Sequence, residues 1–145
     1  MHPLPHTYAV SATAETDTNV TLSSEGLAPI SSAGPAEFDG PGDRWSPESL
    51  LVASVADCFI LTFRAIARAS RFEWTNLDCH VDGLLDRAEG KLRFIGFNVR
   101  ATLTVPAGAN VTKAETLLHK AERGCLVTNS LIADSHLETQ VVINS

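Results

Sequence analysis

The sequence predicts a single α+β domain over residues 1–145, and three observations support this class. A long apolar segment, Pro47 to about Ser70, has the length and the start signals of a helix. Two β-type segments, Trp74–Asp86 and Lys91–Val105, follow it and are joined by a turn-like sequence. Strands and helices do not alternate regularly along the chain, which favours α+β over a doubly wound sheet.

Composition narrows the class of protein further. The chain is 44% hydrophobic and 19% charged, which is typical of a soluble globular protein. Its net charge of -6 argues against nucleic-acid binding, which depends on clustered Lys and Arg. The N-terminal sequence MHPLPHTYAV lacks the features of a signal peptide, and we expect no apolar run of about 18 residues that could span a membrane. We therefore expect a cytoplasmic protein with no nucleic-acid or membrane partner.

The first elements are short and polar. Residues 7–45 are predicted to form a hairpin followed by a loop over the Gly- and Pro-rich stretch Pro29–Gly42. Ser46-Pro47-Glu48 then has the usual chemistry of a helix start, with a Ser cap, Pro at the first position and an acid near the positive dipole end. Because most positions of this helix are apolar, we expect it to be largely buried.

The second half of the chain contains the remaining elements. Val111–Arg123 predicts an amphipathic helix with Thr112 as its cap, and Gly124 ends it. Residues 125–132 are predicted to form a short helix. The alternating segment Leu137–Ile143 predicts a last strand.

Three cysteines are the main candidates for chemistry. Cys58, Cys79 and Cys125 form no Cys-x-x-Cys motif, and cysteines in a reducing compartment more often serve redox chemistry than crosslinking. Cys58 alone is as easily a small apolar side chain inside a helix, whereas Cys125 lies at a helix boundary where a thiol is readily presented. Cys79 and His80 should point to opposite faces of a strand, so we predict that Cys79 is a buried strand residue without a role.

Two segments carry a resemblance to a known family. SPESLLVASVADCF (46–59) and GCLVTNSL (124–131) resemble the two signature motifs of the OsmC/Ohr family, osmotically inducible protein C and organic hydroperoxide resistance protein. In that family the first motif opens the central helix with Pro-Glu and ends at the peroxidatic cysteine, and the second carries the resolving cysteine. The matching positions here are Glu48, Cys58 and Cys125. The resemblance implies antiparallel sheets around a long central helix and an intertwined homodimer.

The same resemblance implies a function. It is that of a thiol-dependent peroxidase for organic hydroperoxides, acting in oxidative stress defence without a cofactor or metal. Cys58 would become a sulfenic acid, Cys125 would condense with it, and an external dithiol would reduce the resulting disulfide. The apolar side chains Val55 and Phe59 near Cys58 would suit an alkyl hydroperoxide.

Helix geometry adds one independent argument for a dimer. Glu48 and Cys58 are ten positions apart, which corresponds to about 15 Å along a helix. If Glu48 acts on Cys58, two antiparallel copies of the helix must share each site. In the family an arginine bonded to this glutamate supplies positive charge, yet residues 7–27 contain no Arg or Lys. Arg44 is the nearest candidate, and the alternative is that it is a solvated loop charge.

Two other hypotheses remain at this point. The chain is alternatively a non-catalytic homologue that binds a small apolar molecule on the same dimeric scaffold, and the missing N-terminal arginine favours this. A metal-binding module built on the cysteines is disfavoured, because their spacing matches no zinc motif.

Overall fold

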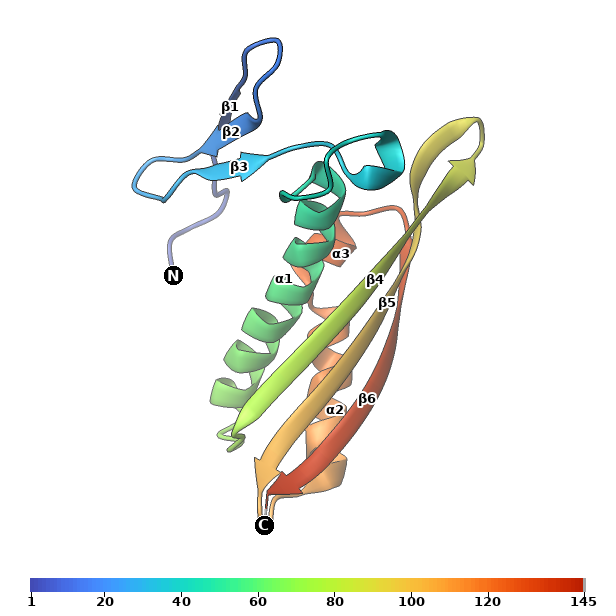
Figure 1. Ribbon diagram of the computed structural model, residues 1–145. Helices are drawn as coiled ribbons and strands as arrows, with labels where there is room; N and C mark the ends of the chain where they lie inside the picture. Colours follow the sequence, from blue (N-terminus) through green and yellow to red (C-terminus); the bar gives the residue numbers. More distant parts are fainter. Residues whose placement is uncertain (145) are drawn as a thin grey trace. The chain divides into compact units, whose positions relative to one another are not determined.

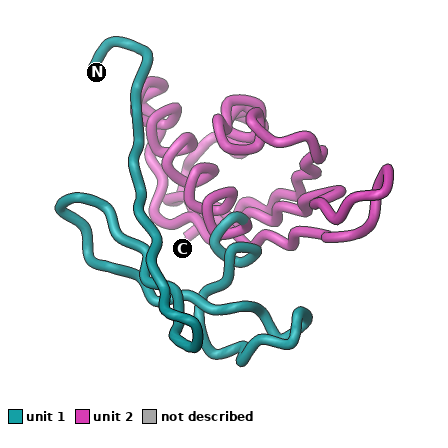
Figure 2. The backbone as a smooth tube through the Cα atoms, turned by 90° about the horizontal axis from the view of Figure 1, so that it is seen from above, with its two compact units in different colours: residues 1–51 teal, residues 52–145 magenta. Residues whose placement is uncertain are grey.

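The computed structural model describes residues 1–144 and divides the chain into two compact units. The first unit spans Met1–Leu51, and the second begins at Val52 and takes in the rest of the described chain (Figure 2). The chain contains both helices and strands, and they do not alternate regularly along the sequence. The α+β class is therefore confirmed. The expectation that residues 1–145 form one domain stays a prediction.

The first unit is a small antiparallel sheet with little covered surface. Its strands are β1 (Ser11–Thr13), β2 (Val20–Ser23) and β3 (Ile30–Ser32), in the order β1-β2-β3, followed by the single 3-10 turn η1 (Ala36–Phe38). The predicted hairpin is therefore extended by a third strand. Several apolar side chains of the unit are exposed: Tyr8, Val10, Leu27, Ile30, Phe38 and Trp45.

Helix α1 spans Pro47–Ala69, as its start signals predict. Ser46 caps it, since its hydroxyl accepts a hydrogen bond from the Ser49 N–H at 3.1 Å. The helix ends in a Schellman motif, in which the Phe72 N–H donates to the Ala67 carbonyl at 2.8 Å. Arg71 occupies the left-handed position of this motif, with φ of 52°, where glycine is the usual residue.

The burial of α1 differs from expectation. Only Val55, Phe59, Phe63 and Ala67, which lie four positions apart on one stripe, are buried. The helix has the length and the mean hydropathy, 1.9, of a membrane-spanning helix, because it contains few charged side chains. The expectation that the chain has no such apolar run was therefore wrong. Core helices of globular proteins meet the same criteria, yet only 22% of this window is buried within the chain. Much of its apolar surface is thus left uncovered in a single copy.

The second unit contains a three-stranded sheet, β4-β5-β6 (Figure 1). Strands β4 (Asn76–Ala88) and β5 (Lys91–Pro106) form the predicted antiparallel hairpin, and positive φ angles at Glu89 and Gly90 make its tight turn. Strand β6 (Asp134–Asn144) pairs with β5 in parallel, which departs from the expected antiparallel arrangement. The two helices between β5 and β6 return the chain to the same end of the sheet, so the last strand has to run parallel.

Helices α2 (Val111–Arg123) and α3 (Leu126–Asn129) make this crossover. The bounds of α2 are as predicted, but its cap is not. The side chain of Asn110 accepts the Lys113 N–H at 3.0 Å, and the prediction of Thr112 as the cap was wrong. Asn110 has the extended backbone that a cap requires, whereas Thr112 is already inside the helix.

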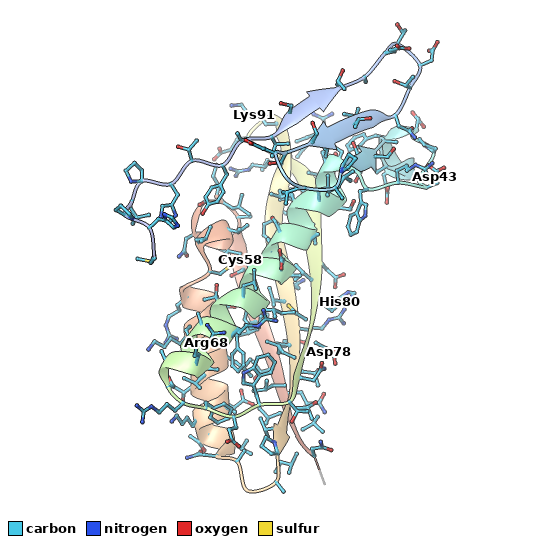
Figure 3. All side chains as sticks on the ribbon, turned by 90° about the vertical axis from the view of Figure 1, so that its left-hand side faces the viewer. Asp43, Cys58, Arg68, Asp78, His80 and Lys91 are labelled. Carbon is cyan, nitrogen blue, oxygen red and sulfur yellow. The ribbon has the colours of Figure 1, made fainter. Side chains whose placement is uncertain are left out.

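Helices α1 and α2 cover one face of this sheet (Figures 1 and 3). The core between them is formed by buried apolar side chains of the stripe on α1, of the inward face of the sheet and of α2. Those outside α1 are Leu77, Phe97, Val99, Ala101, Leu103, Val105, Ala114, Leu117, Leu118 and Ala121. Where α1 crosses β4, Val52 lies directly over Gly83. This crossing fixes the helix that carries Cys58 against the strand that carries Cys79.

Candidate functional site

Cys58 lies in the middle of α1 and is half-buried beside the buried stripe of that helix (Figure 3). Its Sγ is 3.8 Å from Oγ1 of Thr62, one turn further along. The end of α2 comes close here, because a Cβ on Gly124 would lie 3.6 Å from the Thr62 methyl group. The Cys58 face of α1 therefore meets the junction between α2 and α3.

Cys125 lies at that junction, as the residue before the first turn of α3, and only 2% of it is exposed. Its N–H donates to the Glu122 carbonyl at 3.3 Å. Its own carbonyl accepts the Asn129 N–H at 3.0 Å and the Thr128 hydroxyl at 3.2 Å. Hydrogen bonds on both sides thus hold the backbone of Cys125 in place.

Cys58 and Cys125 are free thiols, and they lie close enough for each to shift the pKa of the other. Burial works against ionisation of Cys58, but hydrogen bonds from the Val127 N–H, the Cys125 thiol, the Thr62 hydroxyl and the Leu126 N–H outweigh it and lower the pKa of Cys58. The Cys58 thiol thus ionises more readily than an ordinary cysteine.

The pKa of Cys125 moves in the opposite direction. Burial raises it, the bonds from Thr128 counteract this in part, and the hydrogen bond and the charge of Cys58 raise it further. Of the two thiols, Cys58 therefore ionises more readily, and Cys125 less readily, than an ordinary cysteine. This asymmetry matches one nucleophilic and one resolving thiol.

The groups that lower the pKa of Cys58 are uncharged, and sequence reasoning missed them. A cation was expected near Cys58, whereas two of the donors are backbone amides in the first turn of α3, Leu126 and Val127. Amides at the start of a helix stabilise negative charge without a charged side chain. The short helix expected after Gly124 was the signal in the sequence that backbone donors could be present. Only the tertiary structure shows that the first turn of this helix meets Cys58.

Glu48 and Arg44 both lie in the first unit. Glu48 is in the first turn of α1, about 15 Å from Cys58 by helical rise, and its buried Oε1 has no hydrogen-bond partner among residues 1–144. Arg44 is exposed, and its guanidinium donates to the carbonyl of Asp43 at 3.4 Å. The roles of Glu48 and Arg44 stay predictions.

Cys79 and His80 project from opposite faces of β4, as the strand period requires. His80 points outward (Figure 3), where Asp82 lies 3.1 Å from its Nε2 and also accepts from Arg100 at 3.3 Å. Cys79 is half-buried on the inward face, and burial together with the charge of Cys125 raises its pKa to about 11. Within residues 1–144, no group of three or more His, Cys, Asp or Glu side chains is placed to hold a metal.

Comparison with known proteins adds family information to this geometry. Residues 40–140 match the family model of OsmC-like proteins. The chain is 25% identical over 112 residues to the uncharacterised protein YmaD of Bacillus subtilis, covering 75% of both chains. It is 26% identical over 96 residues to the peroxiredoxin OsmC of Escherichia coli, covering 66% of both.

Solved structures show the same fold. An OsmC-like protein of unknown function from Vibrio cholerae superposes with a TM-score of 0.82 at 18% identity, over 93% of this chain and 99% of the other. An organic hydroperoxide resistance protein OsmC from Legionella pneumophila superposes with a TM-score of 0.76 at 23% identity, over 97% of this chain and 99% of the other. The expected arrangement of sheets and a long helix is confirmed at the level of the fold.

Proposed function

Because the chain belongs to the family of OsmC-like proteins, we propose that it is a thiol-dependent peroxidase that reduces organic hydroperoxides. The observation that carries the proposal is the pair of free thiols Cys58 and Cys125, which act on each other and whose pKa values are shifted in opposite directions. A relative called a peroxiredoxin and a structural neighbour called an organic hydroperoxide resistance protein support the same chemistry.

The reaction proceeds in three balanced steps. The Cys58 thiolate attacks the terminal peroxide oxygen, the O–O bond breaks, and the alkoxide takes a proton and leaves as an alcohol. Cys58 is thereby oxidised to a sulfenic acid, and the thiol of Cys125 attacks its sulfur and releases water. An external dithiol then reduces the Cys58–Cys125 disulfide by exchange and restores both thiols. In the cytoplasm, where we place the protein, such dithiols are available.

A homodimer completes this proposal. Several apolar side chains of the first unit lie on the surface of a single copy. Leu61 on α1 is also 49% exposed. A second copy would cover such surface and could bring its own Glu48 to Cys58, which one helix cannot do. Oε1 of Glu48 has no hydrogen-bond partner among residues 1–144, which supports a partner for this carboxyl that a single copy does not supply.

The alternative function is that of a non-catalytic homologue that binds a small apolar molecule on the same scaffold. It is favoured by one observation, the lack of Arg and Lys in residues 7–27, where the resemblance implies a catalytic arginine. The two functions differ in whether Cys58 reacts faster with a hydroperoxide than an ordinary cysteine does.

The test is a titration of the reduced protein with cumene hydroperoxide, counting free thiols and mapping disulfides by peptide mass spectrometry. We expect rapid loss of two thiols per chain as a Cys58–Cys125 disulfide, no rapid reaction in Cys58→Ser, and a persistent sulfenic acid in Cys125→Ser. Glu48→Gln should slow the reaction, whereas Glu138→Gln, a control at an exposed carboxyl on β6, should not. Equally slow thiol loss in the wild type and in Cys58→Ser would favour the binding protein.

A further inference from the structure

One polar side chain of α1 is paired with the sulfur of Cys58. Thr62 follows Cys58 by four positions, which places both side chains on the same face of the helix. Oγ1 of Thr62 is 3.8 Å from Sγ of Cys58, within hydrogen-bond distance for sulfur. Both side chains are half-buried, so water competes for this contact only in part. The three steps of the proposed reaction involve Cys58 but give Thr62 no part of its own.

The hydroxyl of Thr62 is oriented differently from that of another helical threonine in this chain. A threonine inside a helix can donate to the carbonyl four positions earlier, and Thr116 of α2 does so, to the carbonyl of Thr112 at 3.0 Å. For Thr62 that carbonyl belongs to Cys58, but the hydroxyl is paired with the sulfur. Since a helix leaves threonine two rotamers, a further contact is needed to select the one observed.

The methyl group of Thr62 supplies this contact at the end of α2. A Cβ on Gly124 would be 3.6 Å from the methyl group, so the methyl group packs beside the backbone of Gly124. The methyl group and the hydroxyl are attached to the same Cβ, so a methyl group held in one place keeps the hydroxyl in one rotamer. The end of α2 thereby influences where the hydroxyl of Thr62 is directed.

We propose that Thr62 is the positioning residue of Cys58. Its hydroxyl holds Sγ of Cys58 by a hydrogen bond, and its methyl group, placed against Gly124, keeps that hydroxyl directed at the sulfur. This inference deepens the proposed function and rests on it only for the use that the chain makes of Cys58. It provides an uncharged donor in a chain whose residues 7–27 contain no Arg or Lys.

The hydroxyl favours the ionised form of Cys58. When Cys58 is a thiol, either atom can be the donor, because a hydroxyl both donates and accepts. A thiolate has no hydrogen to donate, so Thr62 is then the donor, and a bond to an ionised acceptor is roughly twice as strong as a neutral one. Burial opposes ionisation, and the hydroxyl of Thr62 lowers the pKa of Cys58 in the same direction as the amide of Val127.

The other titratable groups near Cys58 leave its titration simple to interpret. Four charged side chains on the adjoining turns are exposed, namely Asp57 and Arg64 on α1, and Lys120 and Arg123 on α2. The junction of α2 and α3 contributes Cys125, and the inward face of β4 carries Cys79. Burial raises the pKa of both thiols, to about 11 for Cys79. Both thiols therefore stay protonated at the pH where Cys58 ionises.

The test measures how fast iodoacetamide alkylates Cys58 in the full chain from pH 5 to 10, by peptide mass spectrometry. The rate follows the thiolate fraction, so the midpoint of the profile gives the pKa of Cys58. Thr62→Val keeps the methyl group and replaces the hydroxyl with a second methyl group. We expect its midpoint to rise by about 0.5–1 pH unit. Below the midpoint the rate should fall about three- to tenfold, and the rates should converge once Cys58 is fully ionised.

Two matched variants separate the hydroxyl from the methyl group and from general effects on a helix. Thr116→Val removes a helical hydroxyl that is bonded to the backbone of α2 and should leave the profile unchanged. Thr62→Ser keeps the hydroxyl without the methyl group, so the hydroxyl can turn to the Cys58 carbonyl. Its midpoint should lie between those of the wild type and Thr62→Val. A purely structural role of Thr62 would lower the rate at every pH without moving the midpoint.

The outcomes distinguish this inference from the proposed function. An unchanged midpoint in Thr62→Val, folded by circular dichroism, overturns the inference, and a wild-type midpoint in Thr62→Ser overturns the part given to the methyl group. Thr62→Ala removes both groups without adding bulk, should show the same rise, and replaces Thr62→Val if that variant does not fold. If the midpoints move but cumene hydroperoxide oxidises Cys58 no faster than an ordinary cysteine, the proposed function fails and the inference stands. Rapid oxidation with unmoved midpoints has the opposite meaning.

Discussion

Replacing Gly83 with alanine should destabilise the contact that holds α1 on the sheet. A Cβ at this position would lie 2.7 Å from Cγ2 of Val52 and 3.0 Å from the ring of Phe94. The first distance is about 0.7 Å shorter than the lower limit of ordinary contact, 3.4 Å. Val52 is β-branched and has no flexible end that could move away, so the backbone of α1 or of β4 must shift.

The expected magnitude combines two opposing effects. Overpacking costs about 1–3 kcal/mol, and replacing glycine within a strand returns roughly 0.5–1 kcal/mol. We expect Gly83→Ala to lower the free energy of unfolding by about 1–2 kcal/mol. The double variant Val52→Ala/Gly83→Ala removes the clash, so it should be more stable than the sum of the two single effects by about 1 kcal/mol or more.

The assay is urea unfolding followed by circular dichroism, with all variants at one protein concentration because a dimer unfolds in a concentration-dependent way. Gly96→Ala is the matched control on β5, since its Cβ would meet nothing closer than the Asp134 carbonyl at 3.9 Å. It should leave stability unchanged or raise it slightly. Equal stability of Gly83→Ala and Gly96→Ala, or additivity of the Val52 and Gly83 changes, would refute the packing argument.

Two further predictions concern the ends of the helices. Asn110→Ala should lower the free energy of unfolding by about 1 kcal/mol, because it removes the cap of α2. Thr112→Ala should change it by no more than a few tenths of a kcal/mol. Equal effects at the two positions in urea unfolding would contradict the assignment of the cap. Arg71→Gly should raise the free energy of unfolding by roughly 0.5–1 kcal/mol, since it relieves a left-handed backbone at the end of α1. Arg71→Ala retains that conformation and should show no such gain in the same assay.

Elements with strong local signals could be predicted from the sequence. The start of α1 follows from Ser46-Pro47, a cap and a proline whose missing N–H costs nothing there. The end of α2 follows from Gly124, and the hairpin of β4 and β5 follows from two β-type segments with a tight turn between them. In each case a few adjacent residues determine the backbone conformation, so a single sequence is sufficient to predict the element.

Features that depend on distant parts of the chain could not be predicted in the same way. The parallel pairing of β6 with β5 is decided by the crossover and not by the strand itself. The donors to Cys58 come from Leu126 and Val127, whose side chains carry no sign of this role, because the bonds are made by their backbone. The side chains near the first motif indicated a cation such as Arg44 instead. The paired motifs predicted roles for Cys58 and Cys125, but not the hydrogen bonds that lower the pKa of Cys58.

The amides that lower the pKa of Cys58 have a consequence for the chain during its synthesis. They belong to α3, near the C-terminal end, so Cys58 is made long before the groups that lower its pKa. Until α3 has folded against α1, Cys58 has the modest reactivity of an unstructured cysteine. If Cys58 and Cys125 react as proposed, an incomplete chain would thereby react slowly with a peroxide at a stage when Cys125 has not yet been made. The rate at which an alkylating reagent modifies Cys58 should accordingly report whether this part of the molecule has reached its native state.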